Sequence, residues 1–422
     1  MRRYLQLRTL GLFCAAAFIT TPIQAQQQEE LRVGVIGNLS GVFASSGTTM
    51  VNGIRMAVDE AGGKAGKLPI RLFVVDDEGN PELAITRLKA MDTRDKVDVI
   101  VGPASGNIGM AAVDWAKDSG VPVVVAYSAP EDITMRKAVK NVVRAGWSGA
   151  QPMFAFGEYA AKRGWKRIVM VGQDYVFPHN QIGGFLKTFC RNGGEEVIRV
   201  WHPLNTTDFS SMLAVLPQAD AIMYNGAGGD AVAFYKQLEE FGLRKKMQLL
   251  GGSNFFAVGS LPAMGKGTVG GLSALQYSDA LDTPQFKKFR DAYVKKYNEP
   301  PMATSEHGYV AMKMVIDAVN ATGGKDRDKM IAQLRKTNMP DAPRGPVRLD
   351  DYGNPIQNIY INEVREVDGK LLNVAIAKIE NVSQFGPYDA KTYLADPPDS
   401  RDFPPGKCSD PYYKKKLSLI HI

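Results

Sequence analysis

Short apolar runs alternate with segments of helical periodicity along most of the chain. Residues 31–36 form an apolar run, and residues 50–61 then place Ile54, Ala57 and Val58 at helical spacing. The unit repeats in strand-like runs and helical segments at residues 70–75, 81–91, 97–101, 108–117 and 121–126. Continuous valine and isoleucine runs are typical of strands covered on both faces, as in parallel sheets. This part of the chain predicts a doubly wound α/β lobe.

The same alternation begins again after Arg144 and predicts a second doubly wound, parallel-sheet lobe. Its expected strands are residues 167–171, 196–201, 219–224 and 247–250, and its expected helices are residues 151–162, 181–192 and 230–241. The remaining expected elements are a strand at 271–276, helices at 284–297, 305–321 and 328–337, and strands near Val347 and at 356–364. Residues 385–422 are rich in Pro, Asp, Lys and Tyr and are expected to form an irregular tail, and the sequence leaves open whether residues 414–422 are native.

The composition is that of a folded protein with two to three domains. The chain has 422 residues, of which 45% are hydrophobic and 23% are charged. Its net charge is +7, but three of the basic residues lie among the first ten, and both signs of charge are mixed elsewhere. This balance argues against nucleic acid as a partner.

The N-terminus has the features of an export signal. Arg2, Arg3 and Arg8 accompany an apolar run at residues 10–19, and a run of about ten residues is too short to span a bilayer. We expect cleavage after Ala25, which makes residues 1–25 a signal peptide and places the mature protein in the periplasm of a bacterial host.

The three cysteines have different expected fates. Cys14 lies inside the apolar run and directly after the bulky Phe13, so we do not expect a lipid anchor there. Cys190 and Cys408 remain after cleavage, and an oxidising compartment permits them to pair. The sequence leaves a disulfide and two separate thiols equally open.

Motifs for catalysis and metal binding are missing from the sequence. Its histidines stand only at positions 179, 202, 307 and 421, with no pair spaced for one helical face. There is no Gly-x-Ser-x-Gly motif, no Walker loop and no Gly-x-Gly-x-x-Gly after the first strand. The acidic residues at 76–78 and 131–132 fit helix caps better than acid–base pairs. We therefore expect no enzyme activity, no metal and no cofactor.

Loops rich in Gly, Ser and aromatic residues follow several of the expected strands. They lie at residues 40–47, 102–107 and 127–130. In open α/β sheets ligands bind at the carboxyl ends of the strands, where helix N-termini present free backbone N–H groups and a positive dipole. Serine hydroxyls add hydrogen-bond donors, and glycine permits close approach of a ligand to the backbone. The pattern therefore predicts a site for a carboxylate anion.

Five motifs stand in a recognisable order along the chain. They are the segments at residues 35–41, 76–81 (Asp-Asp-Glu-Gly-Asn-Pro), 101–103, 142–144 and 345–347. This order resembles the leucine/isoleucine/valine-binding type of periplasmic solute-binding proteins of ABC transporters, the type I family, over about residues 31–380. The Asp-Asp-x-Gly-Asn-Pro match is the most specific of the five.

The resemblance implies two lobes joined by three crossover hinge segments, near residues 144–146, 274–276 and 344–348. Lobe 1 would contain residues 31–144 and 277–343, and lobe 2 would contain residues 145–276 and 344–384. It further implies that a small ligand is captured between the lobes by hinge closure and delivered to an ABC permease in the inner membrane. We expect the protein to be a monomer.

The pocket of the family, carried over to this chain, contains donors for a carboxylate but no acid for an ammonium group. The expected donors follow the third and fourth strands and are Ser105, Gly106, Asn107, Ser128 and Ala129. Where the family's amino-acid binders have acids, this sequence has Trp147 or Ser148, and Ser253. A buried ammonium left without its counter-charge costs about 3–5 kcal/mol. An α-amino acid is therefore a poor ligand unless Asp174 or Glu131 turns into the cleft.

Six aromatic residues are expected on loops facing the cleft: Phe43, Tyr127, Trp147, Phe177, Phe255 and Phe256. We expect three of these six to touch the ligand. Aromatic pairs in edge-to-face contact contribute about 0.5–1.5 kcal/mol each beyond burial. Ala227 and Gly228 leave room for a ligand larger than valine. We expect a carboxylate without an ammonium group, and the rings favour an aromatic one.

Other functions are compatible with the same sequence. One is a ligand-sensing subunit that presents its solute to a membrane receptor. Another is a binder of polar amides or branched-chain amino acids. An exported enzyme on a similar two-lobed fold would need a reactive side chain in the cleft.

Overall fold

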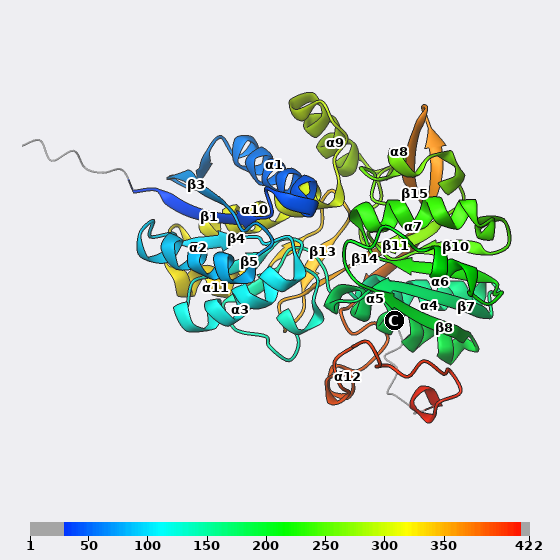
Figure 1. The fold of residues 1–422 in the computed structure, drawn as a ribbon. Helices are drawn as coiled ribbons and strands as arrows, with labels where there is room; N and C mark the ends of the chain where they lie inside the picture. Colours follow the sequence, from blue (N-terminus) through cyan, green and yellow to red (C-terminus); the bar gives the residue numbers. More distant parts are fainter. Residues whose placement is uncertain (1–28, 415–422) are drawn as a thin grey trace, which may run out of the picture.

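Two α/β lobes lie side by side in the computed structural model, which describes residues 29–414 (Figure 1). The predicted signal peptide at residues 1–25, with Cys14 and the cleavage position, lies outside the described residues. So do residues 415–422.

Lobe 1 is built on a six-stranded sheet in the order β2-β3-β1-β4-β5-β6. Its strands are β1 (Leu31–Gly37), β2 (Lys64–Ala65), β3 (Leu68–Asp76), β4 (Val99–Val101), β5 (Val123–Val125) and β6 (Val142–Arg144). All pair in parallel except β2, which runs antiparallel to β3. Strand β1 is buried on both faces, because Val33 and Val35 belong to one apolar core and Ile36 to the other.

Helices cover both faces of this sheet. One core contains residues of α1 (Ala44–Glu60), α9 (Pro284–Tyr297), α10 (Ala303–Thr322) and α11 (Arg327–Leu334). The opposite core contains residues of α2 (Pro81–Thr93) and α3 (Gly106–Ser119). The helices α9, α10 and α11 follow most of lobe 2 in sequence yet contribute to the lobe 1 core, and α10 and α11 lie beside the lobe 1 sheet in Figure 1.

Lobe 2 is built on a nine-stranded sheet. Eight of its strands follow the order β12-β13-β14-β11-β10-β9-β7-β8, and the ninth, β15, pairs with β14. Its strands are β7 (Arg167–Gln173), β8 (Glu195–His202), β9 (Ala221–Asn225), β10 (Gln248–Gly251), β11 (Leu272–Leu275), β12 (Asn338–Met339), β13 (Val347–Leu349), β14 (Pro355–Val367) and β15 (Lys370–Val382). Strands β7 to β11 are parallel, and β12 to β15 pair antiparallel. Its helices are α4 (Gln151–Lys162), α5 (Val176–Phe189), α6 (Ser210–Ala214), α7 (Gly228–Glu240) and α8 (Leu261–Met264).

The chain passes between the lobes three times, after β6, after β11 and between α11 and β14. Arg344, in the third passage, is bonded to the first. Its Nη1 donates to Glu306 Oε2 of α10 at 2.7 Å, its Nε donates to Gln357 Oε1 of β14 at 2.9 Å, and its Nη2 donates to the carbonyl oxygen of Ala145. One buried guanidinium thus holds a lobe 1 helix, a lobe 2 strand and the first passage together.

Some elements differ from the sequence prediction. Helix α1 begins at Ala44, so much of the loop expected at 40–47 is helical. Helix α5 begins at Val176 and not at Gln181, because Pro178 falls in its first turn, where a backbone N–H has no partner within the helix. Strand β15 was not expected at all, and it extends β14 as a long hairpin (Figure 1).

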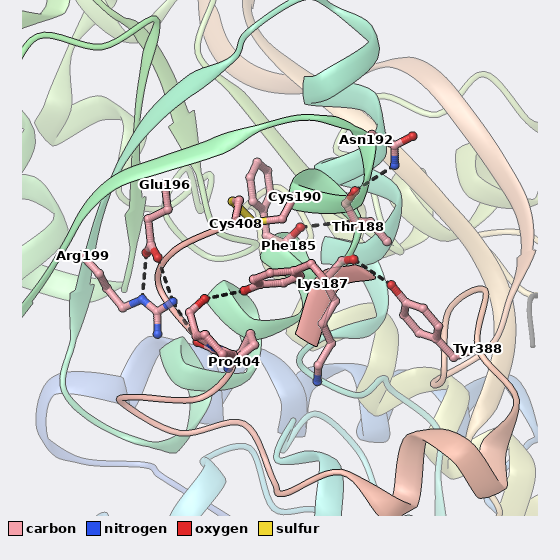
Figure 2. The surroundings of a disulfide bond; sticks show 12 residues. Phe185, Lys187, Thr188, Cys190, Asn192, Glu196, Arg199, Tyr388, Pro404 and Cys408 are labelled. Carbon is pink, nitrogen blue, oxygen red and sulfur yellow. Dashed lines mark hydrogen bonds and ion pairs between the residues drawn. A yellow bond between two sulfur atoms is a disulfide. The ribbon is translucent and has the colours of Figure 1, made fainter. Parts of the chain in front are cut away.

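The tail that follows β15 is attached to both lobes. It contains the short helix α12 (Ala390–Ala395), and Cys408 forms a disulfide with Cys190 at the end of α5 (Figure 2). Lys187 of α5 pairs with Asp399 of the tail at 2.5 Å and donates to the hydroxyl of Tyr393 at 2.9 Å. That hydroxyl in turn donates to Glu131 of lobe 1 at 2.8 Å. Of the two possibilities for the cysteines, the structure contains the disulfide.

Candidate functional site

A cleft of about 470 Å³ lies between the lobes. Lobe 1 contributes the loops after β1, β4 and β5, and lobe 2 contributes those after β7, β9, β10 and β11. These are the carboxyl ends of parallel strands, the edge where open α/β sheets bind ligands. A second hollow of about 720 Å³ lies on lobe 1 between α1, α9 and α10, away from the strand ends and lined by charges of both signs.

The lobe 1 wall of the cleft presents the start of helix α3. Its N-cap residue, Ser105, is extended and its side chain makes no capping hydrogen bond. The first N–H groups of the helix, beginning with Gly106 and Asn107, therefore have no partner within the helix. A Cβ on Gly106 would lie 3.1 Å from Cγ of Pro130, so a larger residue would crowd this turn. The result is an open helix N-terminus that favours an anion.

Two helices of lobe 2 also begin at the cleft. The N-cap residues of α5 and α7 are Tyr175 and Ala227, both extended and neither making a side-chain capping bond. Both residues line the cleft. Three uncapped helix N-termini therefore surround the same space. No lysine or arginine lines the cleft among residues 29–414, so these helix N-termini are the positive ends that face it.

Aromatic rings form a connected wall around the cleft. Tyr127 lies 5.7 Å from Trp147 between ring centroids, and Trp147 lies 5.6 Å from Phe177 at an interplanar angle of 79°. Tyr175 continues the row, 6.2 Å from Phe177. The indole Nε1–H of Trp147 is buried and has no hydrogen-bond partner within the described residues. The wall therefore combines ring faces with an unused donor.

The lobes touch across the cleft. The hydroxyl of Tyr127 in lobe 1 donates to Asn254 Oδ1 in lobe 2 at 2.7 Å. Burial raises the pKa of Tyr127, so this hydroxyl keeps its proton and can donate. The structure is thus a form in which both walls are close enough to contact one small ligand.

Comparison with known proteins identifies the family. A sequence profile described as periplasmic binding protein matches residues 30–370. The chain belongs to this family. Its resemblance to the leucine/isoleucine/valine-binding type is confirmed by a Brucella melitensis protein named Leu/Ile/Val-binding protein homolog 6, which is 27% identical over 389 residues, 90% of this chain and 98% of that protein.

Solved structures of the family share the fold. A solute-binding protein of an ABC transporter from Rhodopseudomonas palustris, in complex with 3,4-dihydroxybenzoic acid, matches with a TM-score of 0.80 and 29% identity, over 84% of this chain and 98% of that one. A second from R. palustris, in complex with benzoate, matches with a TM-score of 0.77 and 28% identity, over 83% and 98%. The predicted fold of two doubly wound lobes joined by three crossovers is confirmed, and this protein is a solute-binding protein.

Ten of the twelve ligand-binding residues predicted for this periplasmic binding protein line the cleft: Phe43, Ser105, Gly106, Asn107, Tyr127, Ala129, Trp147, Phe177, Ala227 and Ser253. Ser128 lies behind this wall, buried against α3 at Gly109. Phe255 packs in the lobe 2 core, 4.9 Å from the ring of Tyr224. Its neighbour Phe256 lines the cleft. Whether three of the aromatic residues touch a ligand stays a prediction.

The acids of the cleft are not the ones that the sequence suggested. Asp174 is held by His179 at 2.9 Å and by Arg401 at 2.6 Å, and Glu131 by Tyr393. Instead Glu78, which follows β3, lines the cleft from lobe 1, and Asp279, which follows β11, lines it from lobe 2. Burial raises the pKa of Asp279 to about 6, although this carboxylate accepts hydrogen bonds from the backbone and side chain of Asn373 at 2.9 and 2.6 Å.

Further lining residues were missed by sequence reasoning: Tyr175, Asn254, Tyr277, Asp279, Met302, Asn362 and Asn373. Tyr277 and Asp279 follow the end of β11, which the rule for parallel strands could have located. Asn362 and Asn373 lie on antiparallel strands, for which no such rule exists.

Among residues 29–414, no helix is long and apolar enough to cross a membrane, and no three His, Cys, Asp or Glu side chains are arranged to hold a metal ion.

Proposed function

We propose that this periplasmic binding protein captures an aromatic carboxylate in the cleft and delivers it to an ABC permease. The observation that carries the proposal is the pairing of a ring-lined wall with uncapped helix N-termini. The rings of Tyr127, Trp147 and Phe177 offer apolar faces, and the start of α3 offers backbone N–H groups for an anion. The benzoate and dihydroxybenzoate bound by the R. palustris proteins support the same class of ligand.

Neutral donors are sufficient to hold the carboxylate in this cleft. The indole N–H of Trp147 is buried without a partner, and the N–H groups after Ser105 have no partner within the helix, so a ligand anion would supply the missing acceptor. A cation is not needed, because a helix N-terminus favours negative charge and charge-assisted hydrogen bonds are strong. The ligand contacts both lobes only when they are closed, so its binding shifts the hinge equilibrium towards closure.

The remaining features of the proposal follow from the family. The protein would work in the periplasm as a monomer after cleavage behind Ala25, with lobe boundaries near residues 144, 276 and 344. It would release its ligand chemically unchanged, because the cleft contains no nucleophile beside a base among the residues that line it. Crosslinking to the inner-membrane complex tests the interaction with the permease. Light scattering of the purified protein tests whether it is a monomer.

Benzoate is the probe for this proposal. The protein is unfolded and refolded to remove bound solute, and benzoate is then titrated by calorimetry and by thermal shift. At a hundred times the dissociation constant, a ligand adds about 2.7 kcal/mol of stability. Benzamide lacks the charge and cyclohexanecarboxylate lacks the aromatic ring, so both are expected to bind less tightly. Failure of benzoate and of its hydroxylated derivatives to bind would refute the proposal.

A branched-chain amino acid is the second candidate. Asp279 in the cleft could pair with an ammonium group, and the Brucella relative is named for leucine, isoleucine and valine. Leucine in the same titration decides between the two. Tighter binding of leucine than of any aromatic carboxylate would establish this second candidate.

A further inference from the structure

Three side chains on the lobe 2 side of the cleft present oxygen acceptors, and the oxygens of two of them have no donor. Asp279 follows β11, Asn362 lies on β14 and Asn373 lies on β15, and all three line the cleft. We call these residues the acceptor end. The Oδ1 atoms of Asn362 and Asn373 are buried and have no hydrogen-bond partner within the described residues.

The hydrogen bonds around the two amides fix which atom is the oxygen. Asn362 Nδ2 lies 2.9 Å from the carbonyl oxygen of Tyr277, an atom that can only accept. Asn373 Nδ2 lies 2.7 Å from the carbonyl oxygen of Phe256 and 2.6 Å from Asp279 Oδ2, and neither of these can donate when Asp279 is ionised. Both NH₂ groups are therefore used, and the unpaired atoms are oxygens that require a donor.

A ligand that carried only a carboxylate would leave these oxygens unsatisfied. A buried acceptor without a partner is destabilising, because it has lost its hydrogen bonds to water and gained none in return. A carboxylate cannot turn towards the acceptor end, because it would face a carboxyl and two amide oxygens without a donor between them. The carboxylate is thus directed to the start of α3 in lobe 1, and the opposite end of the ligand meets the acceptors.

We propose that the ligand carries a hydroxyl on its aromatic ring, and that this hydroxyl donates a hydrogen bond to the acceptor end formed by Asp279, Asn362 and Asn373. The proposal rests on the proposed function, because it assumes that the ring carboxylate binds at α3. It makes the acceptor end the determinant that selects hydroxylated from plain benzoates.

The separation of the two groups argues for a ring substituent and against an ammonium. An α-amino acid carries its ammonium on the carbon next to the carboxylate, so its donors and its anion need adjoining sites. Here the anion site is on helix α3 of lobe 1, and the acceptors are on β14, β15 and the segment after β11 in lobe 2. A ring holds its carboxylate and a distant hydroxyl apart in this manner.

Ligand substitution on the unmodified protein tests the proposal first. Benzoate, 3-hydroxybenzoate, 4-hydroxybenzoate and 4-fluorobenzoate are titrated by calorimetry into refolded protein. At least one hydroxybenzoate is expected to bind about tenfold more tightly than benzoate, a difference of about 1.4 kcal/mol. The fluoro compound has a small substituent that cannot donate and should gain nothing. If benzoate binds as tightly as both hydroxybenzoates, the acceptor end is refuted while the proposed function stands. If none of the four binds, the proposed function itself fails.

Variants then locate the effect. Asn362→Leu and Asn373→Leu should each reduce the preference for hydroxybenzoate over benzoate to less than about threefold. Asn254→Leu is the matched control, because Asn254 also lines the cleft from lobe 2 but its oxygen is already occupied by the Tyr127 hydroxyl. That variant should weaken both ligands alike and keep the preference of about tenfold. A preference retained in both of the first two variants, or lost in the control alone, would overturn the assignment.

Discussion

Replacement of Arg344 by methionine tests how the hinge is held. Arg344 donates to Glu306 at 2.7 Å, to Gln357 at 2.9 Å and to the carbonyl oxygen of Ala145, and its own carbonyl accepts from the Tyr360 hydroxyl at 2.7 Å. Methionine keeps the apolar stem but removes all three side-chain donors. We expect Arg344→Met to lower the free energy of unfolding by about 3–5 kcal/mol, the cost of breaking a buried ion pair.

The size of this effect follows from the burial of Glu306. The side chains of Glu306 and Arg344 are 0% and 1% exposed, so water cannot replace the lost cation. Burial already raises the pKa of Glu306, although Arg344 opposes the shift. Without Arg344 the pKa rises further, and the native state then binds a proton that the unfolded state releases at neutral pH. Stability of the variant therefore falls as pH rises, and the loss is larger at about pH 8 than at about pH 5.

Urea unfolding monitored by circular dichroism at both pH values measures the effect. Arg94→Met is the control, because Arg94 pairs with Asp95 at 2.8 Å while its side chain is 73% exposed, and exposed pairs contribute at most about 1 kcal/mol. The double variant Arg344→Met/Glu306→Gln removes the unpaired charge and should recover at least about 1 kcal/mol of the loss. A loss below about 1 kcal/mol for the single variant, or one independent of pH, would refute this account of the hinge.

Three further predictions concern the cleft and the tail. Trp147→Ala and Phe177→Ala should each weaken benzoate binding at least about tenfold by calorimetry, because each removes a ring of the cleft wall. A cooperative thermal transition shows that the variant still folds. Unchanged affinity in both variants would show that the aromatic wall does not bind the ligand. Cys190→Ser should lower stability by about 2–5 kcal/mol, since the disulfide closes a loop with a sequence separation of 218, and added reductant should then have no further effect. Burial and the nearby Asp399 raise the pKa of Glu131 to about 8. Between the ordinary pKa of a glutamate and 8, the native state therefore binds more protons than the unfolded state, and stability falls as pH rises through this range. Glu131→Gln should flatten this dependence of stability on pH, and an unchanged slope would assign the dependence to other groups.

Local sequence signals were sufficient to predict most of the helices and parallel strands of the two lobes. Helix α2 illustrates this, because Pro81 stands at its first position and Asn80 Oδ1 accepts from the backbone N–H of Glu82 and Leu83 at 2.9 and 3.1 Å. Asparagine caps and a proline at the first turn are independent of tertiary contacts. The prediction at residues 81–91 therefore falls within two residues of the observed helix.

Strand β15 was missed although the sequence contains a signal for it. Asp368 and Gly369 join β14 to β15, and both have positive φ, 50° and 74°. Asp-Gly between two strands is a strong indication of a two-residue hairpin, because this turn requires positive φ at both positions. The strand itself gives little help, because its burial pattern shows no regular alternation over much of its length.

The site was predictable where it follows parallel strands and unpredictable where it does not. Ser105 and Tyr127 were found because each follows a buried strand, and that rule fixes the edge of the sheet. Phe255 and Phe256 are adjacent and both pack in the lobe 2 core, and which of the two also lines the cleft depends on that packing rather than on the sequence pattern. Asn373 reaches the cleft through the hairpin whose existence was itself missed.

The start of α3 and the acceptor end come from different lobes, and this bears on how closure of the lobes is controlled. The free N–H groups of α3 belong to lobe 1, and the unpaired oxygens of Asn362 and Asn373 belong to lobe 2. These groups lie in different lobes, so a ligand with both a carboxylate and a hydroxyl gains its full binding energy only when the lobes meet. A ligand with one of these groups stabilises the closed form less, because a conformational equilibrium shifts only by the difference in affinity for its two states. Selectivity and closure would then have the same physical cause in this protein.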